Sequence, residues 1–238
     1  LGSEISVVSN RLRTPLTALQ LNLLDAYATR LLHENRRANL TGARDREAIY
    51  RRHFVESLAL LAALEDADVL ASPLVDIGAG AGFPGLPMKI ARPGLEDTLI
   101  EATGKKVRFL EALVAELNIA GVRVVQGRAE ELAREPEFRE AYPLAVARTV
   151  APLPVLLELT LPFIKVGGVL AAPKGSSAAR EMREAANALT ELGGEIVSAE
   201  RLELPIDGPQ PTLVLVRKVS QTSDRYPRRS GIPNKRPL

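Results

Sequence analysis

The 238-residue sequence contains no cysteine, no tryptophan and two histidines, and aromatic residues make up 4% of it. The absence of cysteine excludes disulfides, thiolate zinc sites and enzymes that attack with a cysteine nucleophile. It fits a reducing compartment, so we expect a cytoplasmic protein, and we predict no metal site. No run approaches the roughly 18 apolar residues of a membrane helix, and the N-terminal residues have no basic flank followed by an apolar run. We therefore expect neither a secretory signal nor a membrane partner.

Acidic residues are missing from the last fourteen positions, RYPRRSGIPNKRPL, which hold five Lys and Arg residues. The whole chain has a net charge of +2, so the chain without this segment is acidic. A second arginine-rich stretch runs from Arg36 to Arg52. Local basic clusters of this kind indicate an anionic partner. We expect three parts: an N-terminal helical unit (1–72), a central domain (73–219) and a basic C-terminal arm (220–238), in a monomeric protein.

The hydrophobic pattern changes after Pro73. Before it, helical spacing of apolar residues predicts helices over 14–35 and 46–66. After it, short apolar runs at 74–77, 98–100, 122–125, 144–147 and 169–172 alternate with helical stretches at 85–91, 105–118, 152–163 and 177–192. Such alternation predicts a parallel sheet covered by helices. The runs at 195–204 and 212–217 are separated by a link too short for a crossover, which predicts an antiparallel pair.

A glycine-rich loop, VDIGAGAGFPG, follows the first predicted strand and begins the next helix. Gly80, Gly82 and Gly85 satisfy the dinucleotide pattern G-x-G-x-x-G, but in that pattern the first glycine directly follows the strand, and here Gly78 does. Asp76 at the strand end is better suited to a cationic cofactor such as S-adenosylmethionine than to a phosphate. The loop therefore favours a methyltransferase over a nicotinamide enzyme.

Acidic residues also follow the next two strands. Glu101 is placed to accept hydrogen bonds from both ribose hydroxyls of a bound nucleoside, a feature shared with dinucleotide enzymes. After the third strand, the backbone of Ala129 and the Glu130 carboxylate are candidates to hold the adenine edge. Glu130 is equally interpretable as an acid favoured by the dipole at a helix start. Acidic residues after three successive strands favour the methyltransferase over the nicotinamide enzyme.

Six separated motifs resemble one known family. They are NLTGARDREAIYRRHFVESLALL, LVDIGAGAGFPGLPMKIARP, EATGKKVRFLEAL, VVQGRAEELA, AVARTVAPLPVLLELTLPFIKVGGVLAAPKG and YPRRSGIPNKRP. In this order they resemble the bacterial small-subunit rRNA methyltransferase G family, also called glucose-inhibited division protein B. The resemblance runs from about Asn39 to the C-terminus. It implies a Rossmann-like methyltransferase fold, with a mostly parallel seven-stranded sheet, an antiparallel C-terminal strand and N-terminal helices.

The resemblance also implies an activity: transfer of a methyl group from S-adenosylmethionine to N7 of one guanine in the 530 loop of 16S rRNA. The RNA partner is free rRNA, the small ribosomal subunit or a precursor of it. The cofactor-binding residues that it implies, together with those suggested by the pattern, are Asp76, Gly78, Gly80, Phe83, Glu101, Ala102, Thr103, Ala129, Glu130 and Arg148. Guanine N7 has a free lone pair, so this reaction needs positioning and no general base.

Several basic residues are candidates for RNA contacts. Arg148 is a candidate for substrate positioning, or it forms an ion pair with Asp76 or Glu130. Lys105 and Lys106 lie at a helix start, where cations are unfavourable, so either they meet RNA phosphate or Lys105 pairs with Glu101. His53 either packs between helices or acts in the site. The remaining candidates for RNA binding are Lys174, Arg228, Arg229, Lys235 and Arg236.

Two rival functions stay open at this point. The first is a nicotinamide-dependent oxidoreductase built on the same glycine loop, which would bind NADH and not S-adenosylmethionine. The second is a ribosome-assembly factor that keeps the fold and binds RNA without transferring a methyl group.

Overall fold

A computed structural model describes residues 2–238, with side chains from Glu4 onward; Leu1, the first residue of the expected N-terminal unit, lies outside the described residues. Within this range seven strands form one sheet in the order β3-β2-β1-β4-β5-β7-β6. Strand β7 runs antiparallel to β5 and β6, and the other neighbouring pairs are parallel. The predicted fold class is confirmed. The strands are β1 (Leu74–Ile77), β2 (Asp97–Glu101), β3 (Val122–Gln126), β4 (Tyr142–Val146), β5 (Ile164–Lys174), β6 (Gly194–Arg201) and β7 (Thr212–Lys218).

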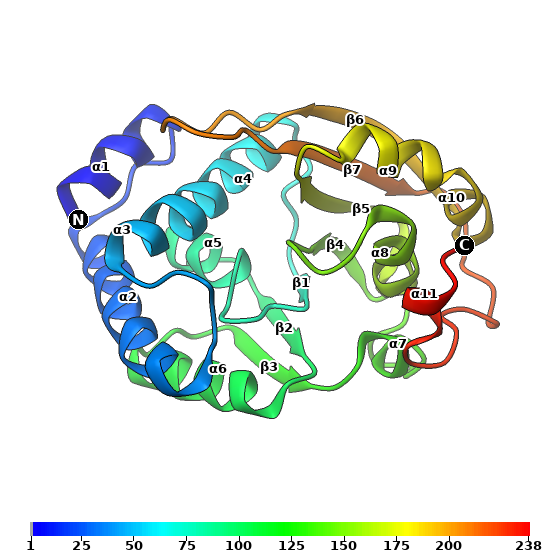
Figure 1. The fold of residues 1–238 in the computed structure, drawn as a ribbon, viewed down its shortest axis with the longest axis horizontal. Helices are drawn as coiled ribbons and strands as arrows, with labels where there is room; N and C mark the ends of the chain where they lie inside the picture. The colour runs from blue at the N-terminus through cyan, green and yellow to red at the C-terminus, as the bar shows by residue number, and fades with distance from the viewer. Residues whose placement is uncertain (1) are drawn as a thin grey trace.

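Helices cover both faces of the sheet (Figure 1). On one side lie α1 (Gly2–Arg11), α2 (Ala18–Ala38), α3 (Arg46–Ile49), the π-helical turn Tyr50–Phe54, α4 (Val55–Asp66), α5 (Gly85–Ala91) and α6 (Gly104–Glu116). On the other side lie α7 (Ala129–Leu132), α8 (Leu153–Thr160) with the 3₁₀ turn Leu161–Phe163, α9 (Ala178–Glu184), α10 (Ala186–Leu192) and α11 (Ile232–Lys235).

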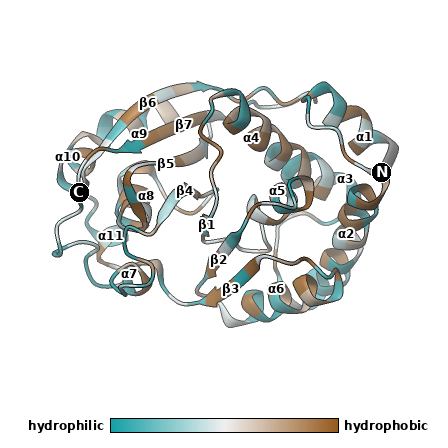
Figure 2. Cartoon of the chain, turned by 180° about the vertical axis from the view of Figure 1, so that it is seen from behind, coloured by the Kyte–Doolittle hydropathy of each residue, from teal (hydrophilic) through white to brown (hydrophobic). Residues whose placement is uncertain are grey.

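Strands β1, β2 and β4 are buried on both faces, which divides the core into two clusters. Because side chains alternate along a strand, Leu74 and Leu144 join the cluster under the N-terminal helices, whereas Val75 and Ala145 join the one under α8 and α10. Figure 2 shows β7 mostly in brown, while β6 at the sheet edge mixes hydrophobic and hydrophilic residues. Near-continuous apolar runs are what a doubly covered parallel sheet requires.

The N-terminal helices share the first of these clusters and have no separate core. The predicted helix over 14–35 begins later, at Ala18, because Thr17 caps it: Gln20 N donates to the Thr17 hydroxyl, and Thr17 N donates to the Gln20 side chain. The preceding helix α1 was not predicted. It is short and polar overall, and Ile5 and Val8 fix it by inserting into the core.

The predicted helix over 46–66 contains a π-helical turn at Tyr50–Phe54. Such turns insert one extra residue per turn and are frequent at functional sites. The predicted helix over 177–192 is interrupted at Ala185, which separates α9 from α10. The antiparallel pair near the C-terminus is confirmed as β6 and β7. None of the helices among residues 2–238 has both the length and the apolar character needed to cross a membrane.

The C-terminal segment 220–238 packs against α7 and α8. The Arg134 and Arg139 guanidinium groups donate to backbone carbonyls between Thr222 and Pro227. Tyr226 is buried, and the Arg228 guanidinium forms a bidentate pair with Glu158, whose side chain is fully buried. The segment is therefore held along its length.

Replacing Arg228 with Ala should lower the free energy of unfolding by about 3 kcal/mol, because the buried Glu158 carboxylate would lose its cationic partner and keep, among the described residues, only the hydrogen bond from the backbone N of residue 228. Arg229→Ala is the matched control, since Arg229 is exposed and surface substitutions change stability by about 0.5 kcal/mol or less. Urea unfolding monitored by circular dichroism measures both. Equal stabilities of the two variants would show that the ion pair does not hold the segment.

Candidate active site

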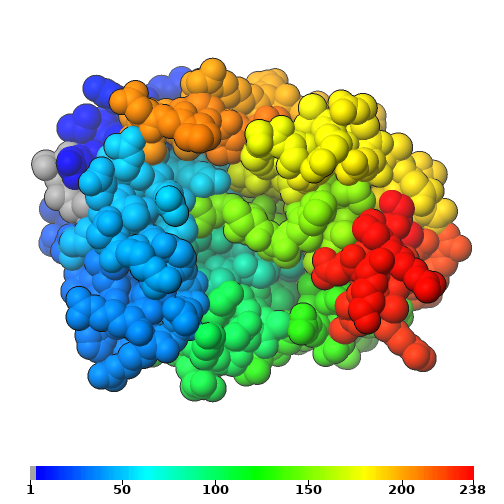
Figure 3. Space-filling view, in the orientation of Figure 1, coloured from blue at the N-terminus to red at the C-terminus, as the bar shows by residue number. Residues whose placement is uncertain are grey.

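The glycine loop lies at the carboxyl end of β1, where it forms the floor of a cavity of about 430 Å³. Gly78 has φ +73°, and a Cβ there would lie 2.8 Å from Val150, so both its conformation and the close approach require glycine. The amides of Gly78 and Ala79 donate to the Ile100 carbonyl and tie the loop to β2. In Figure 3 the surface is hollowed between the blue and cyan N-terminal helices and the green, yellow and red segments.

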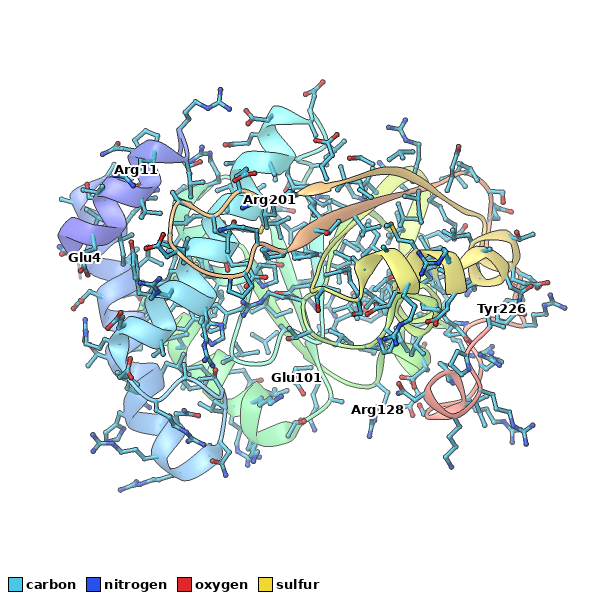
Figure 4. The ribbon with its side chains drawn as sticks, turned by 45° about the horizontal axis from the view of Figure 1, so that its top comes forward. Glu4, Arg11, Glu101, Arg128, Arg201 and Tyr226 are labelled. Carbon is cyan, nitrogen blue, oxygen red and sulfur yellow. The ribbon has the colours of Figure 1, made fainter. Side chains whose placement is uncertain are left out.

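Glu101 ends β2 and faces this cavity with 6% of its surface exposed. Its Oε2 accepts from Gly80 N at 3.0 Å, and its Oε1 accepts from Thr103 N at 2.7 Å. The Lys106 ammonium lies 3.7 Å from Oε2. Each carboxylate oxygen has a second lone pair, so the group is oriented by the protein and still able to accept from a ligand. Figure 4 shows Glu101 near the middle of the molecule.

Asp76 does not face the cavity, although the sequence predicted that it would face a cationic cofactor. It is fully buried under α5, where its Oδ2 accepts from Gly85 N at 2.9 Å, and it does not line the cavity. Asp97 on the neighbouring strand is also buried beside Gly85, where a Cβ would collide with its carboxylate. Burial raises the pKa of Asp76 to about 7, against the lowering effect of the Gly85 hydrogen bond. Burial and the neighbouring Asp76 raise the pKa of Asp97 well above its usual range.

Phe83 anchors the N-terminal helices to the glycine loop. Its ring stacks on Tyr27 of α2, with centroids 5.2 Å apart, and on His53 of the π-helical turn, at 4.3 Å. The Tyr27 hydroxyl donates to the Ala81 carbonyl. The helical unit thus supplies one wall of the cavity, through Leu40, Thr41, Gly42 and His53.

Arg148 follows β4 and is 9% exposed. Its Nη1 donates to the Arg52 carbonyl and to Glu56 Oε2 at 2.9 Å, and its Nη2 donates to His53 Nδ1 at 2.7 Å. The guanidinium carbon lies 5.5 Å from the centre of the Phe83 ring. The predicted alternative partners, Asp76 and Glu130, are replaced by Glu56, which lies far from Arg148 in the sequence. Arg148 therefore connects the sheet to the N-terminal helices.

His53 is both a packing residue and part of the cavity wall. Because Arg148 donates to its Nδ1, the proton of the neutral ring is on Nε2, which lies 2.7 Å from the Thr41 hydroxyl. Burial, and then the positive charge of Arg148, lower the pKa of His53 to about 3. At neutral pH this ring is uncharged and is a poor proton acceptor.

The other predicted cofactor residues surround the same edge of the sheet. Ala102 and Thr103 are exposed and follow Glu101 directly. Ala129 is half-buried at the start of α7. Glu130 is buried, and its Oε1 accepts from Gly231 N at 3.0 Å, so one carboxylate oxygen holds the C-terminal segment. Figure 4 shows Arg128 between Glu101 and that segment.

The candidate RNA-binding residues fall into two groups. Lys105, Arg229, Lys235 and Arg236 are exposed. Lys106 pairs with Glu101, although Lys105 was the expected partner, because the turn of α6 brings the second lysine to the cavity. Lys174 is engaged with Glu181 and the Ala151 carbonyl, both at 2.7 Å, and Arg228 is engaged with Glu158.

No local pattern in the sequence indicated three further residues of the site. Thr41, Glu56 and Thr149 come together there from separate segments. Thr149 has φ +55°, which is unusual for a β-branched residue and typical of strain at functional sites. No pattern of spacing connects these positions, because the connection is made through Arg148 and His53.

Comparison with known proteins places this geometry in a family. The family model described as rRNA small subunit methyltransferase G matches residues 20–206. A protein of that name from Lactobacillus delbrueckii subsp. bulgaricus is 42% identical over 223 residues, covering 94% of this chain and 93% of the relative. The one from Chloroflexus aggregans is 44% identical over 224 residues, covering 94% and 92%.

The chain belongs to the rRNA small subunit methyltransferase G family. Solved structures agree on the fold. Geranyl diphosphate methyltransferase in complex with SAM has a TM-score of 0.54 at 16% identity, covering 73% of this chain and 88% of that one. A putative S-adenosyl-L-methionine-dependent methyltransferase from Methanococcus maripaludis has a TM-score of 0.52 at 15% identity, covering 82% and 93%.

The cavity of this methyltransferase fits the cofactor S-adenosylmethionine. Its volume lies in the range of about 300–1,000 Å³ typical of small-molecule sites. Gly80 adds no side chain to the loop, and a Cβ there would be 3.8 Å from its nearest neighbour, so the backbone is open to a ligand. Glu101 supplies the oriented carboxylate that a ribose diol requires.

Replacing Glu101 with Ala should weaken binding of S-adenosylmethionine at least about tenfold, because hydrogen bonds to a charged acceptor contribute about 1.5–3 kcal/mol. Glu101→Asp keeps the carboxylate and should lose less. Glu111→Ala, an exposed change on α6, is the control. Calorimetric titration gives the three dissociation constants, and an unchanged constant for the Ala variant would remove Glu101 from the cofactor site.

The buried carboxyl pair should make stability fall as pH rises. A group with a raised folded pKa stabilises below its unfolded pKa of about 4, and this contribution is lost as pH rises to about 7 for Asp76. Asp97→Asn removes one member, so it should reduce the loss of stability between pH 5 and pH 8.

Urea unfolding at both pH values measures this difference, with Asp68→Asn as the exposed control. His53 acts in the opposite direction, because its lowered pKa adds stability as pH rises toward about 6.5; it is common to all the variants and cancels in the comparison. Parallel pH profiles for the wild type and Asp97→Asn would contradict the raised pKa values.

Proposed function

We propose that this methyltransferase transfers a methyl group from S-adenosylmethionine to N7 of one guanine in the 530 loop of 16S rRNA. The observation that carries the proposal is that His53, the histidine in the cavity wall, is not available as a general base. His53 has both ring nitrogens engaged and a pKa lowered to about 3, and Glu101 is assigned to the ribose of the cofactor. An acceptor that must lose a proton before it attacks would find no histidine to take it.

Guanine N7 suits such a site. Its lone pair lies in the plane of the ring and is unprotonated at neutral pH, so attack needs orientation alone. When bound, S-adenosylmethionine supplies a methyl group made electrophilic by its sulfonium. The task of the chain is then to fix two ligands and to exclude water from between them. The rigid connections from Phe83 to His53 and from Arg148 to Glu56 serve this task by holding the helical wall against the loop.

We assign the cofactor to the loop of Gly78 and Gly80 and to Glu101, with Ala102 and Thr103 beside its ribose and Ala129 beside its adenine. Phe83, which lines the cavity, contacts the cofactor beside the loop, and Arg148 positions the substrate. Asp76 acts on the cofactor indirectly, because it holds Gly85 N at the start of α5. Glu130 acts in the same indirect way, through the backbone of Gly231.

We assign RNA binding to exposed cations around the cavity, Lys105, Arg229, Lys235 and Arg236. Of the five basic residues in 225–238, Arg225 and Arg228 are paired with Glu191 and Glu158. The other three, Arg229, Lys235 and Arg236, are exposed and are carried on a segment fixed by Arg134 and Arg139. They therefore present charge to phosphates at a fixed place, with less ordering entropy lost on binding than a free arm would lose.

Methyl transfer to defined RNA tests the function. The purified protein is incubated with labelled S-adenosylmethionine and small ribosomal subunits that lack base methylation, and the product nucleosides are mapped by mass spectrometry. We expect one N7-methylguanosine in the 530 loop. Free 16S rRNA and subunit precursors, assayed in parallel, identify which form is the substrate.

Two results would contradict the proposal in different ways. Methylation at another nucleotide would retain the chemistry and change the target. Tight rRNA binding without transfer to any of the three substrates, in the presence of bound cofactor, would leave a ribosome-assembly factor with a methyltransferase fold.

A further inference from the structure

A second cavity, of about 710 Å³, adjoins the first. His53, Arg148 and Thr149 line both, so they form the boundary between the two spaces. None of the predicted cofactor residues except Arg148 lines the second cavity. It is therefore a distinct compartment that adjoins the cofactor cavity at these three residues.

The walls of the second cavity combine apolar, cationic and acidic side chains, and the acidic residues are Asp45, Glu47, Glu56 and Asp207. The connection between β6 and β7 supplies an apolar wall through Leu204, Ile206, Pro209 and Pro211. Arg51 and Arg52 line the opposite side, and Arg51 Nη2 donates to the Asp207 carbonyl at 2.7 Å across the opening. Apolar surface suits a planar ring, the arginines suit its phosphates, and the carboxylates suit the N1–H and amino donors of guanine.

The connection that forms this wall is held in place by its own hydrogen bonds. Leu204 N donates to the Gln210 side chain at 2.6 Å, and the Gln210 amide donates back to the Leu204 carbonyl. Leu202 N donates to the Pro211 carbonyl at 2.8 Å. Ten residues join the two strands, more than a tight hairpin needs, and these hydrogen bonds hold them beside the cavity.

The boundary itself carries two unusual features. Arg148 has a buried Nε with no hydrogen-bond partner among the described residues, although its other nitrogens are engaged. Thr149, the next residue, has a positive φ despite its β-branched side chain. Buried unsatisfied donors and strained backbone both concentrate where a ligand is bound.

We propose that the second cavity receives the acceptor guanine nucleotide, extruded from the RNA, with its N7 edge directed at the His53–Arg148–Thr149 boundary. The proposal rests on the proposed function and names its substrate subsite. The base lies against Ile206, Pro209 and Pro211, its phosphates lie near Arg51 and Arg52, and O6 faces Arg148, so the N7 lone pair stays free to attack the methyl group. The cofactor and the acceptor thus enter from separate compartments and are in direct contact at the boundary that the two share.

A pair of matched tryptophan substitutions tests the subsite. Ala48 of α3 lines the second cavity, whereas Ala63 of α4 lines an unrelated cavity next to Arg11 and Leu213. Both alanines are half-buried helical residues outside the cofactor site. Ala48→Trp should lower kcat/KM for methyl transfer by about 100-fold or more, the effect of misplacing a reactant by about 1 Å. Ala63→Trp should retain transfer, and both variants should bind S-adenosylmethionine as the wild type does.

A second measurement does not depend on transfer, and its first result comes from the wild-type protein. The wild-type protein is photolabelled with 8-azidoguanosine monophosphate in the presence of S-adenosylhomocysteine, and the labelled peptides are mapped. We expect label in 204–211 or 48–56 that excess guanosine monophosphate removes and that Ala48→Trp loses. Full transfer by Ala48→Trp, or label confined to other segments, would overturn the subsite. Failure of the wild type to methylate rRNA, with label still in 204–211, would instead overturn the rRNA target and keep the nucleotide site.

Discussion

The buried Arg148 guanidinium is the interaction on which the site depends. A charge with so little exposure is stable only when its hydrogen bonds are satisfied by fixed partners. Here the partners are the Glu56 carboxylate, the Arg52 carbonyl and the neutral His53 ring, all on the N-terminal helices. The requirement to neutralise one cation at the end of β4 therefore fixes the position of a helical unit that is not part of the sheet.

The π-helical turn belongs to the same constraint. It lies immediately before α4 and carries both His53, which stacks on Phe83, and Phe54, whose ring packs at an angle to Tyr27 and Phe83. The Arg52 carbonyl in this turn accepts from Arg148. A regular helix over the same residues would rotate these groups relative to one another, because each residue of an α-helix turns by about 100°. The irregular turn and the buried cation are thus two parts of one arrangement.

Carboxylates act in this protein mostly as anchors for backbone amides. Glu101 holds Gly80 and Thr103, Asp76 holds Gly85, Glu130 holds Gly231 and Glu181 holds Leu153. Each fixes a loop at the carboxyl edge of the sheet, where ligands gather in such folds. The C-terminal segment is fixed by the converse pattern, in which Arg134 and Arg139 donate to its carbonyls. The loops around the cavity are consequently ordered before any ligand arrives, which reduces the entropy lost on binding.

The sequence by itself determined the elements and the local chemistry of the site. The apolar runs predicted the strands, and the glycines predicted the loop after β1. The position of Glu101 directly after an apolar run predicted that it lies at a strand end. Only the tertiary structure decided which side chains meet. Asp76 is buried under α5 because side chains alternate along β1. Lys106, and not Lys105, pairs with Glu101 because of the turn of α6. Arg148 pairs with Glu56, which is distant from it in the sequence. Periodicity reports which face a residue occupies, whereas partners distant in sequence are chosen by packing and by the need to satisfy buried charge.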